Sequence, residues 1–155
     1  MASFYWYERD PELLQAEKIA MARYFPGFRL EKLSDGKLCW EGSLSPRAAS
    51  GGTWYLQAVY QHNHPDNSSY GGSIRVYSIQ PDLNELCKAA ERLPHILRDE
   101  SGNFYMCTAR MEDFEAGPRE SSSAATSLGW AAKWIFVVEE WLDGSIGDEV
   151  FAHTF

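Results

Sequence analysis

The sequence has no run of basic residues and no long apolar run. Its 14 Lys and Arg residues are outnumbered by 22 Asp and Glu, for a net charge of −8, whereas proteins that bind nucleic acid or anionic membranes usually carry a basic patch. No window approaches the roughly 18 consecutive apolar residues that a membrane span needs. The first residues, MASFYWYERDPELL, lack the positive and then apolar pattern of a secretory signal. We therefore expect a cytoplasmic protein that binds neither nucleic acid nor membranes.

Cysteine and histidine are scarce. Three cysteines, an odd number without paired spacing, are typical of a reducing compartment and predict free thiols. His62 and His64, in QHNHP, have the spacing of two metal ligands, but no further Cys or His completes the set. No glycine-rich phosphate loop follows an expected strand. We expect no metal and no other cofactor, and we interpret the two histidines as a solvent-exposed loop end.

Apolar residues, in contrast, are plentiful. Of the 155 residues, 45% are hydrophobic and 14% aromatic, enough to bury a core within one domain over residues 1–155. Asp10 can cap a helix that starts at Pro11 and stops before Pro26, so a helix over 11–25 is predicted. The apolar residues at helical spacing in it are Leu13, Leu14, Ala16, Ala20, Met21, Tyr24 and Phe25.

Four strands are predicted between Phe28 and Pro81. Phe28 and Leu30 alternate with charged residues, Asp35-Gly36 supplies a hairpin turn, and alternate apolar residues return from Leu38. The segments TWYLQAVYQ and SIRVYSIQP alternate in the same way on either side of the turn-rich HNHPDNSSYGG. The connections have no room for crossover helices, so we expect an antiparallel meander with the first helix over one face.

The second half of the chain predicts less sheet and more helix. A short helix is expected from Asp82 to Arg92, and the stretch 93–123 is irregular, as functional loops often are. A last helix over 128–142, capped near Thr126 or Ser127, completes an α+β fold. Its apolar stripe is interpreted as core: Trp130, Trp134, Val137, Val138 and Trp141.

Cys107 lies in the irregular stretch, and the residues alone leave its reactivity open. Buried cysteines usually behave as small hydrophobes. In favour of reactivity, Thr108 is a small polar neighbour and His95 precedes the cysteine by twelve residues. Three carboxylates between 112 and 115 disfavour a thiolate. A reactive Cys107 is therefore expected to be a slow nucleophile.

The other candidates have ordinary structural interpretations. Cys39 and Cys87 lie at apolar positions of a strand and of the short helix, and we expect both to pack. His95 is expected to be held by a backbone carbonyl, and Asn103 to make the turn beside Gly102. In the functional alternative, one of these polar groups donates a hydrogen bond to the oxyanion of a thioester under attack.

The order of these parts and two segments carry a resemblance to a known family. The segments are LPHILRDESGNFYMC, residues 93–107, and GWAAKWIFVVEEWLDGSIG, residues 129–147. The chain resembles ubiquitin-conjugating enzymes, specifically the short stand-alone bacterial type of cyclic-oligonucleotide anti-phage signalling (CBASS) operons. The resemblance implies a ubiquitin-conjugating-enzyme-like fold, with an N-terminal helix, a four-stranded antiparallel meander, a long active-site loop and a C-terminal helix.

The resemblance also implies a transferase in which Cys107 is catalytic, with His95, Asn103 and Thr108 as supporting candidates. Cys107 is expected to form a thioester with the C-terminal glycine of a partner, a cyclic-GMP-AMP-synthase-like nucleotidyltransferase, and so to prime it for anti-phage defence. The His-Pro-Asn that precedes the cysteine in eukaryotic enzymes is absent here, so no oxyanion-stabilising asparagine is assigned. Two alternatives stay open: an inert module of the same fold that only binds a partner, and a small acidic adaptor or inhibitor.

Overall fold

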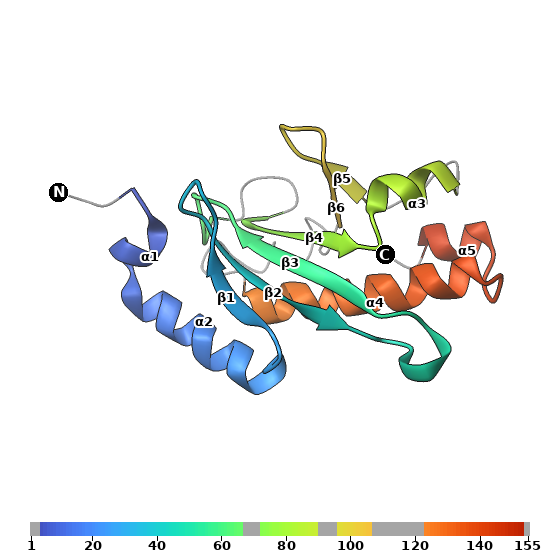
Figure 1. Cartoon of the computed structure of the whole chain (residues 1–155), viewed down its shortest axis with the longest axis horizontal. Coiled ribbons are helices and arrows are strands. Elements are labelled where there is room, and N and C mark those ends of the chain that lie inside the picture. Colours follow the sequence, from blue (N-terminus) through green and yellow to red (C-terminus); the bar gives the residue numbers. More distant parts are fainter. Residues whose placement is uncertain (1–3, 67–71, 90–95, 107–122, 154–155) are drawn as a thin grey trace.

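A computed structural model describes residues 4–66, 72–89, 96–106 and 123–153 (Figure 1). No helix in these four ranges is long and apolar enough to cross a membrane. The elements follow one another in this order: α1 (Trp6–Arg9), α2 (Pro11–Tyr24), β1 (Arg29–Lys32), β2 (Leu38–Leu44), the short 3-10 helix η1 (Ala48–Ser50), β3 (Trp54–Tyr60), β4 (Ile74–Gln80), α3 (Leu83–Ala89), β5 (Ile96–Arg98), β6 (Phe104–Met106), α4 (Ala124–Leu142) and α5 (Asp148–His153).

The described strands form one sheet of six, in the order β1-β2-β3-β4-β6-β5, and every neighbouring pair is antiparallel. The first four strands form the predicted meander, and Gly36 of the predicted turn has a φ of 87°, which glycine adopts without strain. The prediction of only four strands was wrong, because β5 and β6 form a hairpin inside the stretch 93–123 that was expected to be irregular. Strands of three residues are too short to show an alternation in the sequence.

α2 begins where the sequence predicts it and ends within one residue of the prediction. The Asp10 carboxylate accepts a hydrogen bond from the Leu13 N–H at 3.1 Å, and Pro11 takes the first helical position. The helix does not cover the sheet as we expected, because it packs mainly on α4. Tyr24, one of its predicted apolar residues, is 60% exposed. An apolar stripe predicts that a helix packs on something, but not on which element.

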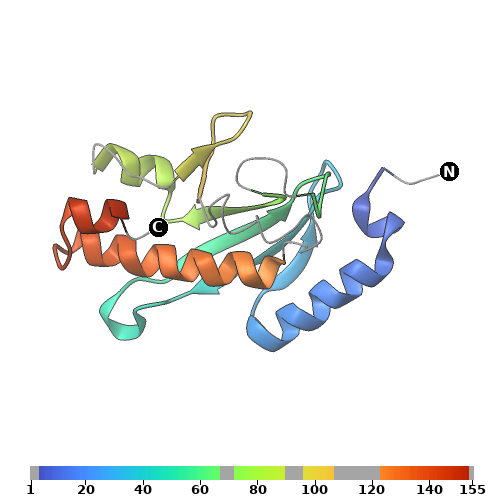
Figure 2. The same cartoon turned by 180° about the vertical axis from the view of Figure 1, so that it is seen from behind.

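α4 is the helix that covers one face of the sheet, where it lies against β3 and β4 (Figure 2). It begins at Ala124, earlier than the predicted residue 128. Ser123, not Thr126 or Ser127, is its N-cap, and the Ser123 hydroxyl accepts a backbone hydrogen bond from the first turn.

The core lies between α4 and the sheet. The alternate residues of β3 predicted to share one face are all buried: Trp54, Leu56, Ala58 and Tyr60. Trp134 is fully buried, with its ring edge-on to that of Trp54 at 6.0 Å. Trp130 and Trp141 are half-buried. The interpretation of the tryptophan stripe as core is therefore confirmed at Trp134 and holds only in part at the other two.

Candidate functional site

β6 leads directly to the cysteine that the sequence singles out. The strand ends at Met106, and Cys107 is the next residue in the chain. Cys107 itself, like His95 and Thr108, lies outside the described residues. Met106 is buried and is paired with Val76 of β4 and with the first residue of β5. The sheet therefore fixes the residue that precedes Cys107.

Asn103 lies at the other end of β6, in the turn of the β5–β6 hairpin. Its backbone N–H donates to Asp99 Oδ1 at 2.9 Å, and its carbonyl accepts from the Asp99 N–H at 2.8 Å. Its side chain is exposed. The three residues of β6, roughly 10 Å of extended chain at about 3.3 Å per residue, separate it from the end of the strand. The described contacts of Asn103 are therefore those of a turn residue, as the structural interpretation of the sequence predicts.

A cluster of polar and aromatic side chains connects β4 to the β5–β6 hairpin. Its two β4 members alternate with the buried Val76, so they lie on the face of the sheet that points away from α4. Its other members come from the hairpin turn and from β6. We call it the Arg75 cluster: Arg75, Tyr77, Asp99, Glu100 and Tyr105.

Arg75 makes most of the contacts in this cluster. Its Nη1 and Nη2 donate to the two carboxylate oxygens of Glu100 at 3.0 and 3.1 Å, and its guanidinium carbon lies 4.9 Å from the centroid of the Tyr105 ring. The Tyr77 hydroxyl donates to Asp99 Oδ2 at 2.9 Å. Hydrogen bonds from Arg75 lower the pKa of Glu100 to about 2, and the bonded Glu100 in turn raises the pKa of Arg75. The pair is therefore fully ionised at neutral pH.

The structure describes the side chain of one of the three cysteines, Cys39. Cys39, in β2, has no exposed surface, and burial together with the charges of Glu41 and Glu31 raises the pKa of its thiol to about 12. Its predicted packing role is confirmed. Cys87 belongs to α3, but its side chain lies outside the described part of the chain.

The prediction that His64 belongs to a solvent-exposed loop end was wrong. His64 is 1% exposed, because the rings of Trp6 and Tyr60 pack against it at 4.6 and 4.8 Å and its Nδ1 lies 2.8 Å from Ser73 Oγ. Burial lowers the pKa of His64 to about 4, so the ring is neutral at pH 7. His62 is half-buried. In the four described ranges, no group of three or more His, Cys, Asp and Glu side chains is placed to hold a metal ion.

Glu17 is a buried carboxylate that joins α2 to the start of α4. Its Oε2 accepts a hydrogen bond from Ser123 Oγ at 2.8 Å, and its Oε1 accepts one from the Ala124 N–H at 3.1 Å. A carboxylate at this position complements the positive end of the helix dipole, although burial raises the pKa of Glu17. His64 Nε2 lies 4.0 Å from Glu17 Oε1, and because the histidine is neutral this contact is not an ion pair. Sequence analysis missed Glu17, although it lies at i+4 from Leu13, inside the apolar stripe of α2.

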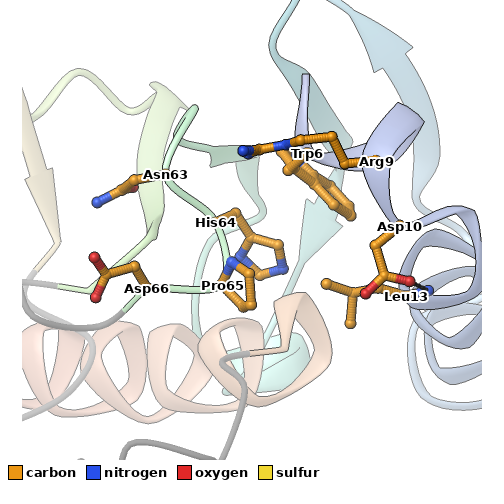
Figure 3. A pocket seen from close by; sticks show the side chains of 8 residues that line it. All are labelled: Trp6, Arg9, Asp10, Leu13, Asn63, His64, Pro65 and Asp66. Carbon is orange, nitrogen blue, oxygen red and sulfur yellow. Dashed lines mark hydrogen bonds between the residues drawn. The ribbon is translucent and has the colours of Figure 1, made fainter. Parts of the chain in front are cut away.

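A cleft of about 550 Å³ opens beside His64. The turn after β3 carries His64 and Pro65. In Figure 3 their side chains lie between those of Asn63 and Asp66, from the same turn, and those of the α1–α2 region. The cleft is lined by Trp6, Arg9, Asp10, Leu13, Asn63, His64, Pro65 and Asp66. None of these residues is a Cys, Ser, Thr or Lys. The cleft can therefore hold a molecule, but among the described residues its lining side chains offer no thiol, aliphatic hydroxyl or amine to accept an acyl group.

A protein-family model described as "Type II CBASS E2 protein" matches residues 17–145. The chain belongs to this family. No curated protein and no solved structure matches the chain. A CBASS E2 protein is an E2-like transferase of anti-phage defence that works with a protein partner of the CBASS system.

The match shows which features of this CBASS E2 protein lie in the family region. It runs from within α2 to just beyond α4 and includes position 107 and the whole Arg75 cluster. It leaves out α1, which supplies Trp6 and Arg9 to the cleft. The end of β6 is therefore a better candidate than the cleft for the site of the family's chemistry. The ubiquitin-conjugating-enzyme-like fold stays a prediction, beside the observed α+β fold with its six-stranded antiparallel sheet.

Proposed function

We propose that the protein is an acyl carrier in which Cys107 forms a thioester with the C-terminal glycine of a partner protein. The proposed partner is a cyclic-GMP-AMP-synthase-like nucleotidyltransferase of the same CBASS system, which the thioester primes for anti-phage defence. The observation that carries the proposal is the position of Cys107 directly after β6, inside the range that matches the family of E2-like transferases.

The burial of Cys39 supports the choice of cysteine. A thiol with a pKa near 12 is almost entirely protonated at neutral pH, and the thiolate is the form that attacks. Cys39 also has no surface on which a partner's tail could dock. Two cysteines remain as acceptors, and of these Cys107 is the one that the resemblance to ubiquitin-conjugating enzymes assigns.

The proposed transfer has simple chemistry. The Cys107 thiolate attacks the carbonyl carbon of an activated C-terminal glycine, the bond to the leaving group breaks with its electron pair, and a thioester remains. The thioester keeps the acyl group reactive without ATP at the next step. Because the sequence shows no phosphate-binding loop, the activated glycine is supplied by another protein or by the partner itself.

The proposal is tested by measuring the intact mass of the protein after co-expression with the proposed partner nucleotidyltransferase. We expect a heavier species that hydroxylamine or a thiol reductant removes, because both cleave thioesters and neither cleaves amides. Cys107→Ala abolishes the species, and Cys107→Ser converts it to a more stable oxyester. Cys87→Ser and Cys39→Ser are the matched controls, and both keep the thioester.

Two outcomes decide against the proposal. The wild type gains no mass beside an intact partner with a free C-terminal glycine, or the Cys107→Ala protein gains mass equally. An inert binding module then replaces the acyl carrier, with the small acidic adaptor as the further alternative.

A further inference from the structure

The strand that leads to Cys107 is joined to its neighbours by side-chain contacts as well as by backbone pairing. Within the described residues, β6 runs over Phe104–Met106 and is paired with β4 at Val76 and Met106. Its three pairs with β5 join it to another three-residue strand, at the edge of the sheet. A two-stranded hairpin is marginally stable by itself, so contacts with β4 help to decide where β6 lies.

The Arg75 cluster supplies these contacts from the neighbouring strand. The guanidinium group of Arg75 binds both oxygens of Glu100, in the hairpin turn, and stacks on the ring of Tyr105, in β6. Tyr77 binds Asp99, at the start of the same turn. The cluster thus holds the hairpin at its turn and along β6, while the Val76–Met106 pair holds the end of the strand.

The geometry of Arg75 suits it to fix a position rather than only to add stability. A planar guanidinium that binds a carboxylate through two parallel hydrogen bonds restricts both the distance and the orientation of its partner. The Arg75 side chain is 16% exposed and that of Glu100 is 80% exposed. An ion pair with one partner this exposed contributes little to the free energy of folding. Tyr105, on which Arg75 stacks, is 4% exposed and stands two residues before Cys107.

We propose that Arg75 is a positioning residue for Cys107: through Glu100 and Tyr105 it holds β6 against β4, and the rate of acyl transfer depends on it. The inference rests on the proposed function, because it takes Cys107 as the acyl acceptor. A displacement of about 1 Å at a reacting atom can slow a reaction about 100-fold, even when the substitution lies outside the reacting groups.

Arg47 offers a matched control. Its side chain is 12% exposed, close to the value for Arg75, and it forms ion pairs with Glu140 at 3.2 Å and Asp143 at 2.6 Å. These pairs join the connection between β2 and β3 to the end of α4 and involve neither β5 nor β6. Arg47→Gln therefore removes two ion pairs of a similarly buried arginine from a different part of the described fold.

The test compares Arg75→Gln, Arg75→Lys and Arg47→Gln at a temperature where circular dichroism shows all three folded. The rate of adduct formation is measured by intact mass over a range of partner concentrations. We expect Arg75→Gln to lower the maximal rate about 10- to 100-fold with the half-saturating concentration unchanged. Arg75→Lys keeps the positive charge but loses the two parallel hydrogen bonds of the guanidinium group, so an intermediate rate is expected. Arg47→Gln stays within about twofold of the wild type, since it leaves the hairpin contacts intact.

Amide hydrogen exchange, which needs no partner and no acyl transfer, is measured on the same proteins. We expect Arg75→Gln to speed exchange at Tyr105 and Met106, and Arg47→Gln to leave it unchanged. Equal exchange in the two variants, or equal transfer rates for Arg75→Gln and the wild type, overturns the positioning role and leaves the proposed function standing. If the wild type forms no adduct at all, the proposed function fails and takes the positioning role with it.

Discussion

Replacing Trp134 by alanine tests whether α4 packs on the sheet through this residue. Trp134 is fully buried, and its ring meets that of Trp54 at 6.0 Å with an interplanar angle of 84°. Truncating a buried large aromatic side chain costs about 3 to 5 kcal/mol, because it removes buried apolar surface and leaves a cavity. About 0.5 to 1.5 kcal/mol of that loss belongs to the edge-to-face pair. Each kcal/mol lowers Tm by roughly 2–4 °C in a domain of this size, so Tm should fall by about 6 to 20 °C.

Trp130→Ala is the matched control, because it removes the same side chain from the same helix. Trp130 is half-buried, and the Lys133 ammonium lies 5.2 Å from its ring centroid. We expect a loss below about 2 kcal/mol, from partial burial and a weak cation–π contact. Urea unfolding followed by circular dichroism gives both free energies of unfolding. Equal losses in the two variants, or a loss below about 1 kcal/mol for Trp134→Ala, would refute the packing described here.

Two further predictions concern buried titratable groups. Because burial lowers the pKa of His64 from 6.5 to about 4, the unfolded state binds this proton more readily, and the free energy of unfolding should drop by about 3 kcal/mol as pH falls from 6.5 through 4. His64→Gln should flatten that part of the pH profile in urea unfolding, and identical profiles for both proteins would contradict this account. Cys39, fully buried and with its pKa raised to about 12, should resist iodoacetamide at pH 8 in the native protein and react after unfolding, as peptide mass mapping can show. Rapid alkylation of native Cys39 would show that β2 is not packed as described.

The sequence by itself determined the parts of this protein that depend on neighbouring residues. Asp10 and Pro11 start α2, and Pro26 ends it, through effects that reach only a few positions along the chain. The Asp35-Gly36 turn and the alternation in β3 likewise act locally, so both were predicted correctly. The choice of Cys107 also came from the sequence, through a resemblance that the family match supports at the level of an E2-like protein.

Only the tertiary structure decided which residues are buried or paired by distant parts of the chain. His64 is buried because Trp6, on α1, and Tyr60, on β3, pack against it. The local sequence QHNHP does not predict these contacts. Arg75 and Glu100 are 25 positions apart and meet only because β6 pairs with β4. The β5–β6 hairpin likewise lies beside β4, and the fold rather than the residues of the hairpin decides that neighbour. Local patterns record propensity, whereas burial and pairing depend on the partner that folding brings close.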